Sequence, residues 1–349
     1  APVRAAIERH RRGLDRDPRR YLAVNEHREE DAAGAAAGHL RTRADHIALT
    51  DSTTMGLGTV FGGLRLGAGD EILMTRHEHF SARQAATFAA ARTGAELREV
   101  ELYPPREPER ATAEGIVRAI ERGIGAATRV VLVTWVHSSS GMRLPLRDIA
   151  RAVDGRALLV VDAAHALGAG RIAVEETGCD VLVAGCHKWL AGPRGTGIVW
   201  ARESAWERMA PTIPSFRGGS RGALLTPGGY HSFEHRWALN EAFALHDAIG
   251  PERIARRIDG LARRLRAGLK AIEGVTVHAP DDPVLHSGVV TFSVRGTEAD
   301  ALVDRLARRH GVLGSVTPYD IRLARFGTCW MNTRREVDAA IRAVAASAG

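Results

Sequence analysis

The sequence predicts an α/β protein with a mainly parallel sheet flanked by helices, followed by a smaller α+β domain. Two short apolar runs, Ala157–Val161 and Val181–Ala184, have the length and the valine content of buried parallel strands. Helical patterns alternate with further apolar runs along the same part of the chain, which is typical of βαβ units. We therefore expect a large domain over residues 21–242 and a smaller one formed by residues 1–20 and 243–349.

The order of elements follows from hydrophobic periodicity and from breaker residues. Residues 1–20 are charged and amphipathic and predict a helix that stops at Pro18. Further helices are expected over residues 29–42, 51–67, 81–93, 111–123, 243–249, 252–272, 298–309 and 335–346. Strands are expected, besides the two apolar runs, over residues 46–50, 71–75, 96–102, 129–136, 196–201, 275–278, 288–294, 312–316 and 320–324.

Composition excludes several classes of protein. No apolar run approaches the ~20 residues that a membrane-spanning helix needs. The net charge of +7 comes from arginines that are spread along helices beside acidic residues, as in residues 251–270, so we expect a solvated surface and no nucleic-acid partner. The three cysteines have no paired spacing, which favours free thiols in the reducing cytoplasm. His77 and His79 do not predict a metal site.

Polar residues follow the two apolar runs. Asp162 comes directly after the first, and Gly185-Cys186-His187-Lys188 follows the second. Because ligands bind at the carboxyl ends of strands in open α/β sheets, we expect Asp162 and Lys188 to lie close together there. A buried salt bridge without a ligand is the alternative, but it is costly because both charges lose their water.

Lysine is rare in this chain. Lys188 and Lys270 are the two lysines among 48 basic residues, which leaves 46 arginines. A lysine retained after a buried strand indicates amine chemistry, because the guanidinium of arginine stays protonated and forms no Schiff base. An aspartate beside such a lysine suits pyridoxal phosphate. The carboxylate keeps the pyridine nitrogen protonated, and the lysine carries the aldehyde.

The segments around this pair resemble those of a known family. D-A-A-H at 162–165 and H-K-W-L-x-G-P-R-G-T-G at 187–197 are similar to the class V aminotransferases, within the isopenicillin N epimerase-like and cysteine desulfurase-like branch. The resemblance extends over nearly the whole chain. It implies the fold of fold-type I enzymes, pyridoxal 5'-phosphate as cofactor, an amino-acid-like substrate, and a homodimer with the active site at its interface.

The start of the helix at 51–67 is a candidate anion site. Hydroxyl and free N–H groups at a helix N-terminus bind phosphates, and the resemblance implies that Thr53 and Thr54 hold the cofactor phosphate. On the residues alone, Ser52-Thr53-Thr54 could also be an N-cap run without a ligand. His187 resembles the phosphate-side histidine of the family.

The resemblance implies further contacts with the cofactor. His79, which follows Glu78, would stack on the pyridine ring, and Ala164 would present its methyl group to the opposite face. Ser138 occupies the position of the residue that contacts the phenolic oxygen. His165 would reach a cofactor oxygen or a substrate group.

Two arginines complete the implied site. Family enzymes carry a threonine that binds the phosphate of the partner subunit, but this chain has Phe233-Glu-His-Arg-Trp there, so Arg236 or His235 would replace that contact. Arg322 stands where the family has the arginine that binds the substrate carboxylate, and Arg325 is the second candidate. Bidentate guanidinium–carboxylate geometry suits this role.

The implied chemistry takes place at the Cα of an amino acid, with Lys188, Asp162 and His79 as catalytic residues. A desolvated lysine can abstract the Cα proton, so an aminotransferase or an epimerase is expected, with a C–S or other lyase as the alternative. Desulfurases need a mobile cysteine ahead of the carboxylate-binding arginine. Residues 311–320 contain none, and Cys329 lies beyond Arg322, which disfavours a desulfurase.

Two alternatives from other classes stay open. Gly56, Gly58 and Gly62 resemble a dinucleotide fingerprint and would indicate a nicotinamide-dependent oxidoreductase, although the next strand ends in Arg76-His77 where an acidic residue is needed. A non-catalytic binding protein of the same fold is the other alternative, because Gly185 and Trp237 depart from the family pattern.

Overall fold

The large domain is built on a seven-stranded sheet. The computed structural model describes residues 2–348. The strands are β1 Ile47–Thr50, β2 Glu71–Thr75, β3 Glu96–Val100, β4 Thr128–Thr134, β5 Leu158–Asp162, β6 Val181–Gly185 and β7 Gly197–Ala201. Their order is β1-β7-β6-β5-β4-β2-β3. Strands β3, β2, β4, β5 and β6 pair in parallel, and β7 runs antiparallel to both neighbours. The mainly parallel sheet is therefore confirmed.

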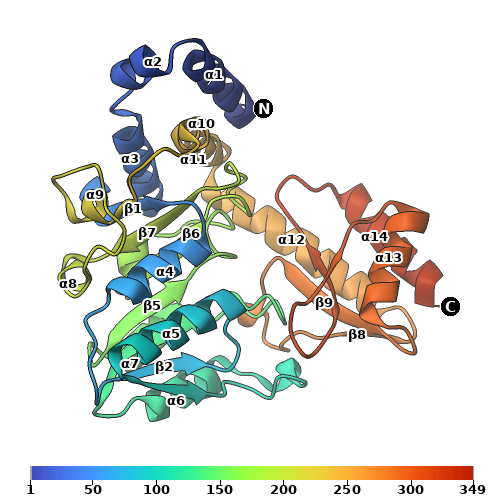
Figure 1. Cartoon of the computed structure of the whole chain (residues 1–349). Coiled ribbons are helices and arrows are strands. Elements are labelled where there is room, and N and C mark those ends of the chain that lie inside the picture. The colour runs from blue at the N-terminus through green and yellow to red at the C-terminus, as the bar shows by residue number, and fades with distance from the viewer. Residues whose placement is uncertain (1, 349) are drawn as a thin grey trace.

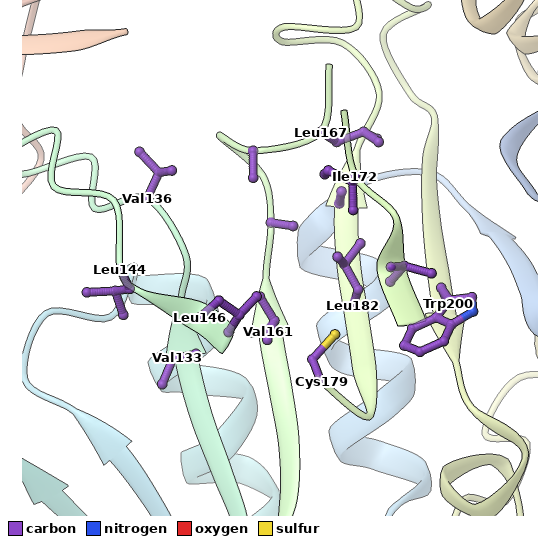
Figure 2. Packing of buried hydrophobic residues seen from close by; sticks show 14 of the residues in the cluster. Val133, Val136, Leu144, Leu146, Val161, Leu167, Ile172, Cys179, Leu182 and Trp200 are labelled. Carbon is purple, nitrogen blue, oxygen red and sulfur yellow. The ribbon is translucent and has the colours of Figure 1, made fainter. Parts of the chain in front are cut away.

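Helices cover both faces of this sheet (Figure 1). On one face lie α4 Thr53–Gly63 and α5 Phe80–Thr93; on the other lie α3 Arg28–Leu40, α6 Ala113–Gly123, α7 Leu146–Val153 and α11 Leu239–Ile249. Successive residues of β5 point to opposite faces. Leu158 and Val160 join one apolar cluster, while Leu159 and Val161 join the other. Figure 2 shows Val161 of the second cluster beside Val133 and Leu182. Burial on both faces explains why these strands are continuous apolar runs.

Short helices connect the main elements. The α-helices are α8 Glu203–Trp206, α9 Arg221–Leu225 and α10 Phe233–Trp237, and the 3₁₀ turns are η1 Ala44–His46, η2 Pro108–Arg110, η3 Val174–Thr177 and η4 Pro283–Leu285. None of the helices within residues 2–348 combines the length and the apolar character needed to cross a membrane.

The N-terminal helix expected over residues 1–20 is divided in two. Helix α1 spans Pro2–Arg16 and α2 spans Pro18–Val24. Asp17 separates them and caps α2, because its side chain accepts a hydrogen bond from the Arg20 backbone N–H at 3.0 Å. Pro18 then stands at the first helical position, where its missing N–H costs nothing. Helix α1 contacts α2, α10 and α11; the expected domain boundaries stay a prediction.

The second domain is an antiparallel sheet covered by helices. Its strands are β8 Val275–Val277, β9 Val289–Val294, β10 Ser315–Val316 and β11 Ala324–Gly327, in the order β10-β11-β9-β8, and its helices are α12 Pro251–Lys270, α13 Ala299–His310 and α14 Arg334–Ala348. The strand expected over residues 312–316 is shorter in the structure, because β10 begins at Ser315, and the strand expected over residues 320–324 was placed too early. Residues 317–323 form a turn instead, in which Thr317 bonds to the Leu323 backbone N–H and to the Ile321 carbonyl.

Gly168 allows the turn after β5 to pack closely against the backbone of the segment that carries Lys188. Its φ is +84°, and a Cβ atom there would lie 2.1 Å from the Leu190 backbone nitrogen. We expect Gly168→Ala to lower the free energy of unfolding by about 1 kcal/mol for left-handed strain and by a further ~1–3 kcal/mol for the clash. The matched control is Gly155→Ala, with φ +67° but open space around it. Equal losses in urea unfolding would contradict the predicted clash.

Candidate active site

The carboxyl ends of three adjacent strands meet at one edge of the large sheet. Thr134 at the end of β4 pairs with Asp162 at the end of β5, and Asp162 pairs with Val183 of β6. The segments that follow these strands enclose, with the starts of α4 and α5, a cavity of about 200 Å³. The cavity is lined by Ser52, Thr53, Thr54, His79, Ser81, Thr134, Val136, Ser138, Asp162, Ala164, His165, His187 and Lys188. Every residue expected to bind the cofactor lines this cavity, except Arg236.

Asp162 and Lys188 face the same cavity without forming an ion pair among the described residues. Asp162 is 2% exposed and accepts a hydrogen bond from the Ala164 N–H at 2.9 Å. Burial raises its pKa to about 6, against the opposing effects of that N–H and of Lys188. Burial lowers the pKa of Lys188, and Arg325 adds to this, while Asp162 opposes it. Lys188 Nζ lies 3.1 Å from His165 Nε2 instead. The buried salt bridge considered as an alternative is therefore not formed.

The first turn of α4 has features that suit an anion. Ser52 supplies the helix cap, because its Oγ accepts a hydrogen bond from the Met55 N–H at 3.0 Å. The side chains of Thr53 and Thr54 line the cavity, and a Cβ atom on Gly185 would approach the Thr53 hydroxyl oxygen to 3.2 Å. The departure from the family pattern at Gly185 therefore leaves space beside the helix N-terminus, where an anion binds most favourably.

Gly56 of this helix has a packing explanation. A Cβ atom on Gly56 would lie 2.5 Å from Val183 Cγ1, so glycine allows α4 to approach the sheet closely. A Cβ atom on Gly58 would meet nothing within 4 Å, so packing does not explain Gly58. The dinucleotide fingerprint is therefore not needed to account for Gly56.

His79 stands at the N-terminus of α5 and closes one side of the cavity. Its Nδ1 atom lies 2.7 Å from the Ser81 hydroxyl, and its ring packs 4.1 Å from that of Phe80. Burial, helped by Lys188 and Arg325, lowers the pKa of His79 to about 4, so the ring is neutral at pH 7. A neutral, held ring is suited to stacking on a flat ligand.

Glu78 is a buried residue that sequence reasoning missed. It is 2% exposed and accepts hydrogen bonds from the hydroxyls of Thr75 at 2.6 Å and Thr134 at 2.5 Å. Burial raises its pKa to about 7, with Asp162 contributing in the same direction. The signal available in the sequence was an acidic residue three positions after the end of a buried strand, between two histidines.

Arg322 does not reach the cavity, which corrects the first assignment of the substrate arginine. Its guanidinium forms a bidentate pair with Asp300 at the exposed surface, with distances of 2.7–2.9 Å. Arg325 is half-buried beside the cavity, and it donates to the Ser138 carbonyl at 3.1 Å and to the Ser315 hydroxyl at 3.0 Å. The two arginines differ because β11 begins at residue 324. Arg325 belongs to this strand, which directs its side chain, whereas Arg322 precedes the strand.

Tyr319 was also missed. Its hydroxyl lies 2.7 Å from the Ser138 hydroxyl, and burial raises its pKa. Ser138 lines the 200 Å³ cavity, whereas Tyr319 lines a neighbouring cavity of about 800 Å³ that also contains Phe80 and Tyr103. This hydroxyl pair therefore stands between the two cavities.

Arg236 forms ion pairs within its own chain, and its contact with the phosphate of a partner subunit stays a prediction. It is 3% exposed and pairs with Glu29 at 3.0 Å and with Asp51 at 3.1 Å. These contacts join α10 to α3 and to the residue before the α4 cap. Arg236 thus supports the start of α4 from outside, where a partner-subunit contact with a phosphate was expected.

Comparison with known proteins identifies the family. The sequence profile described as Aminotransferase class-V matches residues 26–338. The chain belongs to the class V aminotransferase family. This confirms the resemblance and, with it, pyridoxal phosphate as the expected cofactor.

Several class V relatives are similar over most of the chain. Isopenicillin N epimerase of Streptomyces clavuligerus is 28% identical over 84% of this chain and 77% of its own length. A cysteine desulfurase of Klebsiella pneumoniae (strain 342) is 31% identical over 72% of this chain and 63% of its own length. Among solved structures, the cystine C–S lyase C-DES with its product cysteine persulfide has a TM-score of 0.90 at 22% identity, covering 99% of this chain and 94% of that one. Fold-type I is therefore confirmed.

The residues of the cavity fit the cofactor of the class V family. The start of α4 provides donors for a phosphate, and glycine at 185 leaves room beside it. Asp162 provides a buried carboxylate that a protonated ring nitrogen would satisfy. Thr53, Thr54 and His187 would hold the phosphate end, Asp162 the ring nitrogen, and Lys188 the aldehyde.

Glu78 should make the stability of this class V protein depend on pH. The folded protein keeps a proton on Glu78 up to about pH 7, whereas an ordinary glutamate loses it near 4.5. Stability therefore falls as pH rises through this window. Relative to Glu78→Gln, the wild type should lose up to about 3 kcal/mol between about pH 5 and about pH 8. Urea unfolding measures this, with Glu121→Gln on the exposed face of α6 as the control. A constant difference would contradict the buried acid.

Proposed function

We propose that this protein is a pyridoxal-phosphate-dependent enzyme that acts at the Cα of an amino acid or an amine-bearing metabolite, as an aminotransferase or an epimerase. The observation that carries the proposal is that Asp162 and Lys188 share one buried cavity yet form no ion pair among the described residues. An amine whose pKa is lowered by burial, beside a buried carboxylate, is suited to accepting and returning a proton. A lysine with only a structural role would not need to lie in a cavity beside an unpaired, buried carboxylate.

The residues around the cavity have distinct roles in this proposal. Lys188 removes the Cα proton of the substrate and returns it to the same or to another carbon. Bound pyridoxal phosphate supplies an electron sink for the pair of electrons left on Cα. Asp162 holds the proton of the ring nitrogen, which maintains that sink. His79 covers one face and excludes water from the reacting carbon.

Arg325 is proposed to bind the substrate carboxylate. Its two hydrogen bonds, to Ser138 and Ser315, use two of the five N–H donors of a guanidinium. The other donors are available for a carboxylate at the mouth of the cavity. The substrate side chain would then extend past Tyr319 into the 800 Å³ cavity, whose lining combines aromatic residues with charged ones.

A C–S lyase is the second candidate, because relatives named cysteine desulfurase and a structural neighbour named cystine C–S lyase support it. A desulfurase that uses a cysteine nucleophile is less well supported. Residues 311–320 contain no cysteine, and Cys329 packs with Trp189, Ile254 and Trp330 in a separate apolar cluster.

We also propose that the enzyme is a homodimer. Phe216 and Tyr230 are 80% and 83% exposed on the segment between α8 and α10, and Ile213 on the same segment is 39% exposed. Large apolar side chains that protrude from one segment are typical of a surface that another chain covers. In the family resemblance this segment crosses the dimer interface.

The two lysines allow a direct test of the proposed cofactor linkage. Purified protein supplied with pyridoxal phosphate should show a visible absorbance band that is retained in Lys270→Ala and lost in Lys188→Ala. The physical reason is that Lys270 is exposed at the end of α12, whereas Lys188 lines the cavity. Loss of the band in both variants, or in neither, would refute the proposal.

The same samples separate the candidate reactions. Release of a 2-oxo acid with transfer of the amino group identifies an aminotransferase. Uptake of deuterium at Cα with inversion identifies an epimerase. Release of reduced sulfur from cysteine or cystine identifies a lyase.

Arg325 and Arg322 form a matched pair for testing substrate binding. We expect Arg325→Ala to lower kcat/KM by about 100-fold, because losing a buried charge-assisted pair costs about 3 kcal/mol, with most of the effect in KM. Arg322→Ala removes a surface pair with Asp300 and should change kcat/KM less than about threefold. The opposite ranking in steady-state kinetics would return the role to Arg322.

A further inference from the structure

The indole of Trp189 is joined to Lys188 through His165. Trp189 Nε1 lies 3.2 Å from His165 Nδ1, and His165 Nε2 lies 3.1 Å from Lys188 Nζ. The two side chains that contact His165 therefore come from neighbouring residues of one segment, and His165 comes from the turn after β5. These three groups form a short, continuous chain of polar contacts at the cavity.

The directions of these contacts follow from the chemistry of the groups. An indole N–H can only donate, so His165 Nδ1 must accept and carries no proton. A neutral imidazole then carries its proton on Nε2, which donates to Lys188 Nζ. An ammonium group has no free lone pair and cannot accept. Both contacts are satisfied together when Lys188 is an uncharged amine.

We propose that Trp189 is a positioning residue: by donating to His165 Nδ1 it keeps the His165 proton on Nε2, so that His165 donates a hydrogen bond to the uncharged amine of Lys188. The proposal concerns the protein without bound cofactor. Its consequence for catalysis rests on the proposed function, because an uncharged amine is the form of Lys188 that can take a proton.

The indole is held firmly enough to impose this arrangement. Trp189 is 7% exposed and packs with Ile254, Ile258 and Val289. A Cβ atom on Gly288 would lie 2.6 Å from its ring, so glycine there makes room for the indole. Trp330 Nε1 donates to the Trp189 carbonyl at 2.9 Å and holds the backbone.

Burial and most of the charged groups around His165 and Lys188 favour the uncharged forms of both side chains. Burial lowers the pKa of His165 well below its usual range, and Lys188, Arg325, His79 and His187 act in the same direction. Asp162 is the group that opposes loss of the Lys188 proton. Asp162 forms no ion pair with Lys188 among the described residues, so a hydrogen bond from His165 adds to the effect of burial in favouring the uncharged amine.

The scarcity of lysine makes a direct measurement possible. In cofactor-free protein labelled with ¹³C at lysine Cε, the spectrum should contain two side-chain signals, and Lys270→Arg assigns the one from Lys188. A pH titration of Trp189→Phe should show the Lys188 pKa raised by about one unit relative to wild type, because the freed imidazole can move its proton to Nδ1 and accept from the ammonium group at Nε2. In Trp200→Phe, which removes an indole that donates to Thr42 and keeps the Trp189 donor, the Lys188 titration should stay at the wild-type value.

A second measurement is made on the wild-type protein, and a variant serves only to assign the signal. In wild-type protein labelled with ¹⁵N at histidine, His165 should show a protonated Nε2 and an unprotonated Nδ1 at neutral pH, with the signal assigned by its loss in His165→Gln. A proton on Nδ1 would overturn the proposal, as would an unchanged Lys188 titration in folded Trp189→Phe. Either result would leave the proposed function intact, which the Lys188→Ala absorbance test decides separately.

Discussion

The site depends on the burial of an acid and an amine at the adjacent ends of β5 and β6. Parallel pairing brings the ends of these strands to one edge, with Asp162 opposite Val183, and the residues that follow β6 carry Lys188 over the same cavity. Asp162 is buried and Lys188 is half-buried, and burial shifts each group toward its uncharged form.

The same low-dielectric environment acts on the groups around the pair. Burial raises the pKa of Glu78 to about 7 and lowers that of His79 to about 4, so neither residue is forced to carry a charge beside the cofactor cavity. The main charge left at the rim is that of Arg325, which stays protonated as guanidinium groups do in proteins. A cavity whose mouth carries a cation is suited to a substrate with a carboxylate, as the proposed function requires.

Arginine serves three separate purposes in this protein. Arg325 lies beside the cavity, Arg236 is buried between Glu29 and Asp51 and supports the start of α4, and Arg322 pairs with Asp300 at the surface. A residue type that accounts for 46 of the 48 basic residues cannot be assigned a role from its identity alone. Lysine is informative for the opposite reason, because one of its two occurrences faces the cavity.

Local sequence patterns and the family resemblance predicted the sheet, the edge at which the cavity lies and most of the residues that line the cavity. Continuous apolar runs reveal strands buried on both faces, and polar residues directly after them must gather where parallel strands end, so Asp162 and Lys188 could be predicted from local patterns. Three features were decided by tertiary structure alone: the position of Arg325 beside the cavity, the ion pairs of Arg236, and the bond from Trp189 to His165. Each depends on contacts between segments far apart in the chain. The start of β11 follows from its pairing with β9, and a shift of one residue in a strand reverses the side to which a side chain points.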